Sequence, residues 1–104
     1  LYELGTVARH DPAYAARYID LYQRQVALYV GILEAGAAVG VFDLTDDVQT
    51  IARNLVVLED GYGLHITMAV PTFDVATAER QLLGYAATAT RCDLESGSTP
   101  EVAR

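Results

Sequence analysis

The longest helical pattern in the chain lies in residues 11–42, DPAYAARYIDLYQRQVALYVGILEAGAAVGVF. Asp11 is a residue type favoured as a helix N-cap, and Pro12 suits the first helical position, where no backbone N–H bond is lost. Two glycines near the end of the segment can adopt the left-handed conformation with which many helices end. The segment therefore predicts a long helix over residues 12–38.

Three further helices are predicted around the long one. Residues 1–9 form a short helical stretch, Thr45 or Asp46 caps a helix over 47–70 that ends before Pro71, and Asp74 caps a helix over 74–92. No segment has the period-two alternation of a half-buried strand. We therefore expect an all-α fold, an antiparallel bundle of about four helices.

The length of the chain fits one domain. With 104 residues it can bury a single core, and we expect residues 1–92 to form that domain. Residues 93–104 are rich in Ser, Gly, Thr, Pro and Glu, which predicts a disordered C-terminal tail. The chain begins with Leu1 inside a helical pattern, so we expect it to be a piece of a longer protein.

The composition limits the partners of the chain. Hydrophobic residues make up 52%, which excludes a disordered chain, and the formal net charge is −7. DNA phosphates would repel such a domain, so DNA could be contacted only through a domain absent from this chain. No apolar run reaches the length of about 18 residues that a membrane span needs. With its single cysteine, Cys92, the chain is expected to be cytoplasmic.

The sequence offers little for catalysis. It holds no nucleophile elbow, phosphate loop, zinc motif or paired-carboxylate arrangement, so we expect no enzyme, no cofactor and no metal. Glu59 and His65 are six residues apart and would point in different directions from a helix. A lone histidine such as His65 is more often a hydrogen-bonded packing residue than a ligand or base.

One stripe of the long helix is rich in polar aromatic groups. Its members, spaced four, four, three and four residues apart, are Tyr14, Tyr18, Tyr22, Gln25 and Tyr29. The opposite edge carries Arg17, Asp20, Gln23 and Arg24 and is expected to face water. The tyrosines either fill a core with their hydroxyls leaning outward or form the wall of a partly polar cavity.

Glu59 lies in the middle of an apolar face of the third helix. It is either exposed or paired at the edge of that face, or it is a pocket carboxylate that orients a ligand. The second alternative predicts a ligand-binding site formed by Tyr18, Tyr22, Gln25, Tyr29, Glu59 and Tyr62. Aromatic walls and a carboxylate would suit a small, partly aromatic or amphipathic effector with a donor or positive charge.

The third helix is apolar on a second side as well. That side, together with the small residues of the fourth helix, predicts a homodimer interface with a two-fold four-helix contact. Its predicted members are Val57, Gly61, Leu64, Met68, Gly84, Ala87 and Thr88.

Several features follow one another along the chain: Ala8-Arg9-His10-Asp11-Pro12, a long helix with Tyr22, the turn Gly36-x-x-x-Gly40-x-Phe42, Ala52 after an acidic cap, Asp60-Gly61 with Leu64 three residues later, and the break at Pro71 and Asp74. Their order resembles the sensor domain of TetR-family transcriptional regulators over about residues 1–91. Glu59 departs from the apolar residue usual before the Asp-Gly pair.

The resemblance implies a homodimer formed by the last two helices and an effector pocket within each helical domain. Effector binding would shift a separate DNA-binding domain and release the operator, as in a repressor. Two other function classes remain open on the sequence. One is a small helical ligand-binding protein or enzyme unrelated to transcription, and the other is a pure dimerisation module with a filled core.

Overall fold

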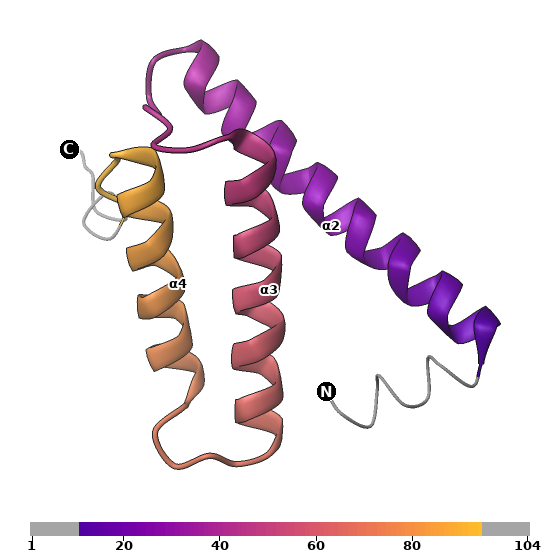
Figure 1. Ribbon diagram of the computed structural model, residues 1–104. Coiled ribbons are helices and arrows are strands. Elements are labelled where there is room, and N and C mark those ends of the chain that lie inside the picture. The colour runs from indigo at the N-terminus through magenta and orange to yellow at the C-terminus, as the bar shows by residue number, and fades with distance from the viewer. Residues whose placement is uncertain (1–10, 95–104) are drawn as a thin grey trace.

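The computed structural model describes residues 11–94, which form three helices and no strand. They are α2 (Pro12–Ala38), α3 (Val48–Thr67) and α4 (Val75–Thr90), and α3 and α4 lie side by side while α2 crosses α3 at an angle (Figure 1). This confirms the all-α fold class, with three helices in the described part of the chain where about four were expected for the whole.

Two of the predicted segments fall largely outside the described residues. They are the short helix over residues 1–9 and the tail from residue 95 onward. Of the predicted tail, Asp93 and Leu94 are described: the Leu94 side chain is half-buried and its N–H donates to the Cys92 carbonyl at 2.9 Å.

The long helix α2 has the predicted bounds because both of its ends carry strong local signals. Asp11 accepts hydrogen bonds from the N–H groups of Ala13 and Tyr14, both at 3.1 Å. At the other end Gly40 has a φ of +82°, which a glycine adopts without strain. The chain then turns back over the helix end.

The third helix is shorter than the predicted range of 47–70. Asp47, rather than Thr45 or Asp46, is the N-cap and accepts from the Thr50 N–H at 3.2 Å. The helix ends at Thr67, three residues before the expected end at Val70. It stops there because Ala69 takes a left-handed φ of 59°.

The fourth helix also ends before its predicted limit at Cys92. Asp74 caps it as expected, accepting from the Thr77 N–H at 2.7 Å. The helix stops at Thr90 because Arg91 is left-handed, with a φ of 50°, and the Cys92 N–H then bonds back to the Ala87 carbonyl at 3.2 Å.

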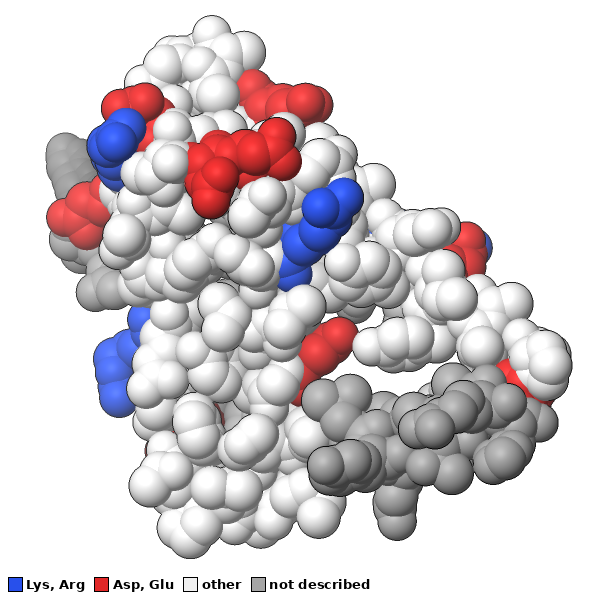
Figure 2. Space-filling model, in the orientation of Figure 1, with Lys and Arg blue, Asp and Glu red and all other residues white. Residues whose placement is uncertain are grey.

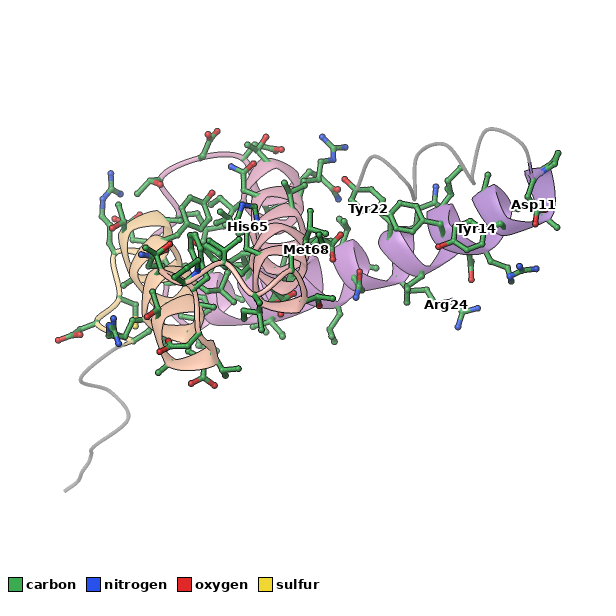
Figure 3. The ribbon with its side chains drawn as sticks, turned by 90° about the horizontal axis from the view of Figure 1, so that it is seen from below. Asp11, Tyr14, Tyr22, Arg24, His65 and Met68 are labelled. Carbon is green, nitrogen blue, oxygen red and sulfur yellow. The ribbon has the colours of Figure 1, made fainter. Side chains whose placement is uncertain are left out.

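The core lies where α3 meets its two neighbours. Its buried apolar members are Val26 and Leu33 from α2, Ile51, Ala52, Leu55 and Val56 from α3, and Ala89 from α4. All of them belong to the C-terminal half of α2, the N-terminal half of α3 and the end of α4. The N-terminal half of α2 extends beyond α3 (Figures 1 and 3).

The loop between α2 and α3 is fastened to the end of α4. The N–H groups of Asp43 and Thr45 donate to the carbonyls of Thr90 and Ala89, both at 2.8 Å. These carbonyls lack partners within the helix, so the loop satisfies them. Arg91 adds an exposed ion pair with Asp43 at 2.7 Å. The loop therefore fixes α4 relative to the end of α2.

Candidate functional site

The structure separates the two predicted sides of α2 in part. Its polar edge, Arg17, Asp20, Gln23 and Arg24, is exposed, and Arg24 pairs with Asp20 at 2.6 Å. Tyr22, Gln25 and Tyr29 are half-buried, while Tyr18 is 39% exposed. Figure 3 shows Tyr22 and Arg24 on opposite sides of the helix.

Tyr29 and Glu59 meet across the α2–α3 contact. Burial, and after it the side-chain hydrogen bond and the charge of Glu59, raises the pKa of Tyr29 to about 12. Burial and the neighbouring carboxylate therefore favour the neutral phenol of Tyr29, and the ligand site that would include both residues stays a prediction. Glu59 itself is exposed, which matches the first of its two alternatives while still placing it beside a predicted site residue.

Tyr18 faces a carboxylate that the sequence analysis did not include. Partial burial raises the pKa of Tyr18, and the charge and hydrogen bond of Asp60 raise it further. Tyr18 and Tyr29 are three helical turns apart on α2 and yet reach adjacent residues of α3. The neighbouring carboxylates Glu59 and Asp60 thus each lie near one tyrosine hydroxyl of the crossing helix.

We expect the raised pKa of Tyr29 to be visible in an alkaline titration. Because the folded pKa exceeds the ordinary value of 10.0, the stabilisation is fully present below pH 10 and is lost as the pH rises toward about 12. Tyrosinate absorbance of the wild type should show a late-titrating phenol that is absent in Tyr29→Phe and shifts to lower pH in Glu59→Gln. A titration identical in the wild type and Tyr29→Phe would contradict the contact.

Tyr22 lines a separate hollow between α2 and α3. The hollow has a volume of about 360 Å³ and is lined by Tyr22, Gln23, Val26, Ala27, Val30, Gln49 and Arg53. Arg53 gives it a cationic side chain. Tyr22 therefore does not line the hollow that Glu59 lines, and none of the three hollows described here is lined by all six predicted residues.

Tyr62 and Glu59 share a hollow between α3 and α4. It has a volume of about 210 Å³, and its other lining residues are Gly63, Ile66, Val75, Ala78, Glu79 and Leu82. The Tyr62 ring also packs against Phe73, with centroids 5.8 Å apart, and Phe73 meets the His65 ring at 5.2 Å. His65 Nδ1 lies 2.8 Å from the Gly61 carbonyl, which agrees with its expected packing role.

A third hollow lies between α2 and α4 over the core. Its volume is about 210 Å³, and it is lined by Tyr29, Ile32, Leu33, Phe42, Leu55, Leu82, Leu83, Ala86, Thr90 and Leu94. Of the two hydroxyl groups, that of Thr90 already donates to the Ala86 carbonyl at 2.7 Å. Only Tyr29 among these residues was in the predicted site, because helical periodicity does not show which helices converge.

The predicted interface residues of α3 are uncharged, and two of them are strongly exposed. Val57 is 59% exposed and Met68 is 69% exposed, with Gly61 and Leu64 half-buried between them. On α4, Gly84 and Ala87 are half-buried and Thr88 is exposed. The surface over α3 and α4 carries few charged side chains in the view of Figure 2. The interface itself stays a prediction.

The described residues contain no group of three or more histidine, cysteine, aspartate or glutamate side chains that could hold a metal ion. Among the helices of residues 11–94, none is long and apolar enough to cross a membrane.

Residues 2–91 match the model of a protein family described as "BetI-type transcriptional repressor, C-terminal". No curated protein and no solved structure matches the chain. The family match covers the whole α2–α4 region and includes the glycine turn, the α3 hydrophobic side and both groups of candidate residues.

Proposed function

Since its residues 2–91 match that family, the chain belongs to the C-terminal domains of BetI-type transcriptional repressors, a TetR-type family, and we propose that it is the effector-sensing and dimerising domain of a transcriptional repressor. The family match carries the proposal. Domains of this family are generally not enzymes, so we propose no catalytic activity, and we place the regulator in the cytoplasm with the DNA that it would control.

The outer surface of α3 supports the dimerisation half of the proposal. Apolar side chains as exposed as Val57 and Met68 are costly to leave in water when they lie on one side of one helix. Small residues on the adjoining side of α4, such as Gly84 and Ala87, would let a second subunit approach closely. A two-fold contact of α3 and α4 with their copies would cover both sets.

The hollows beside Tyr29 and Glu59 support the sensing half. Two open surface hollows of about 210 Å³ each, which share Leu82, lie between α2 and α4 and between α3 and α4, and a domain serving only dimerisation would not need them. A small molecule bound there would contact all three helices. It could bias the angle of α2 against α3 only by binding one arrangement more tightly than another.

The test of the proposed function is the oligomeric state together with ligand-dependent stability. We expect sedimentation equilibrium to give a homodimer, and we expect a matching effector to raise the melting temperature. A chain that stays monomeric at high concentration and responds to no small molecule would overturn the proposal.

We also predict that this chain does not bind double-stranded DNA by itself. Its formal net charge is −7, and its α2–α3 loop carries the exposed carboxylates Asp43, Asp46 and Asp47 at one end of the molecule, where acidic side chains gather in Figure 2. Phosphates would be repelled. A mobility shift of DNA by the 104-residue chain at physiological salt would contradict this prediction.

A further inference from the structure

We propose that Asn54 and Tyr85 decide which chain this domain accepts as its dimer partner. Their unused hydrogen-bonding groups are complementary to those of the same two residues in a second copy of the chain. The inference rests on the proposed function and deepens it, because it concerns the identity of the partner rather than the existence of a dimer. Neither residue belongs to the interface set predicted from the sequence.

The two side chains join α3 to α4 on the surface that carries the predicted interface. Asn54 Nδ2 donates to the Tyr85 hydroxyl oxygen at 2.9 Å. Asn54 is exposed and lies three residues before Val57, which is 59% exposed, so the two share one side of α3. Tyr85 is half-buried and directly follows Gly84, one of the small residues of α4. A second copy that covers Val57 and Gly84 would therefore cover this hydrogen bond as well.

The hydrogen bond leaves part of each side chain unpaired. It uses one amide hydrogen of Asn54 and one lone pair of the Tyr85 oxygen, so Asn54 Oδ1 can still accept and the Tyr85 hydroxyl can still donate. Within residues 11–94 the structure gives neither group a further hydrogen-bond partner. Neither residue lines any of the hollows described above, so a small molecule bound in those hollows would not pair with them.

Contact with a second subunit would remove water from these groups. A donor or acceptor that loses water without gaining a partner weakens association. A two-fold axis beside the pair would bring each Tyr85 hydroxyl to Oδ1 of the partner subunit's Asn54, and the same bond would then form twice. A partner with apolar side chains at both positions would leave the donor and the acceptor unpaired.

The surroundings give this polar pair its weight in the choice of partner. Apolar contacts are non-directional, whereas a single polar side chain within an apolar contact can fix the partner and the register. Of the predicted interface members only Thr88 carries a side-chain hydroxyl, and the others are apolar or small: Val57, Gly61, Leu64, Met68, Gly84 and Ala87.

Native mass spectrometry of mixed full chains, one chain of each mixture being labelled with ¹⁵N, tests the inference. Wild type mixed with the Asn54→Leu, Tyr85→Phe double variant should form heterodimer with an exchange constant about tenfold below that of random pairing. The reason is that only the mixed dimer places polar groups opposite apolar ones. Wild type mixed with Gln23→Leu, which changes an exposed amide of α2, is the control and should pair at random.

The two single variants should show the opposite behaviour when they are mixed with each other. Each homodimer, of Asn54→Leu or of Tyr85→Phe, repeats the same unpaired group twice. In their heterodimer the remaining Tyr85 hydroxyl meets the remaining Asn54 amide oxygen, so the exchange constant should rise about tenfold above that of random pairing. Circular dichroism checks the folding of every variant.

Random pairing in both mixtures would overturn the inference and leave the proposed function standing, because every chain would still be dimeric. A monomeric wild type would overturn both. An equal departure from random pairing in the Gln23→Leu control would also overturn the inference, since the effect would not depend on Asn54 and Tyr85. Because Asn54 is exposed and Tyr85→Phe removes one oxygen, the single variants should keep the fold, and their mixture decides the matter even if the double variant is unstable.

Discussion

Gly36→Ala is expected to lower the free energy of unfolding by about 3 kcal/mol, the order seen when a packed aromatic side chain is displaced. A β-carbon at Gly36 would lie 2.7 Å from Cγ of Phe42 and closer still to two other carbons of its ring. The ring cannot simply swing away, because Phe42 packs against the core and the Gly36 carbonyl holds the turn by accepting from Val41 and Phe42 N–H groups at 2.9 and 3.1 Å.

Gly31→Ala is the matched control, since it makes the same change inside the same helix. Nothing lies within 4 Å of a β-carbon at Gly31, so alanine there should raise stability by about 0.5–1 kcal/mol through helix propensity. In the Gly36→Ala, Phe42→Ala double variant the two losses of unfolding free energy should be less than additive, because the new β-carbon no longer meets an aromatic ring. Equal stability of Gly36→Ala and Gly31→Ala in urea unfolding would refute the close approach.

The bounds of α2 could be predicted from the sequence because the residues at its ends have conformational preferences of their own. Asp11 and Pro12 favour a helix start, and Gly40 supplies the positive φ at its end. The ends of α3 and α4 were placed two or three residues too late because Ala69 and Arg91 take left-handed conformations. Neither residue type favours that conformation, so the sequence carried no sign of it.

The candidate site was predictable only in part, for a related reason. Periodicity put Tyr22, Gln25 and Tyr29 on one stripe of α2, and all three are half-buried, but Tyr18 on the same stripe is 39% exposed. It could not supply the angle at which α2 crosses α3, and that angle decides which residues face each other. As a result, Tyr22 faces the hollow with Arg53, whereas Tyr29 meets Glu59. The approach of α4 to α2, which creates the apolar hollow, depends on the loop bonds of Asp43 and Thr45 to the end of α4.

Val57→Glu is expected to convert the proposed homodimer to a folded monomer, with the dissociation constant raised about 100-fold or more. In a two-fold interface each substitution occurs twice, so two carboxylates would enter the same packed region. In the monomer Val57 is 59% exposed, and a substitution at such a surface position changes stability by only about 0.5 kcal/mol. The loss would therefore be one of association rather than of folding, and sedimentation equilibrium with circular dichroism separates the two.

Leu28→Glu is the control that identifies the interface. Leu28 lies on α2 and is 63% exposed, close to the value for Val57, so both variants place a charge at an equally accessible apolar position. If α3 and α4 form the dimer, Leu28→Glu should remain dimeric while Val57→Glu does not. The reverse result would place the contact on α2 and show that the predicted interface set is wrong. Dissociation of both variants would show that α2 also lies in the interface, because a dimer formed by α3 and α4 alone leaves Leu28 outside the contact.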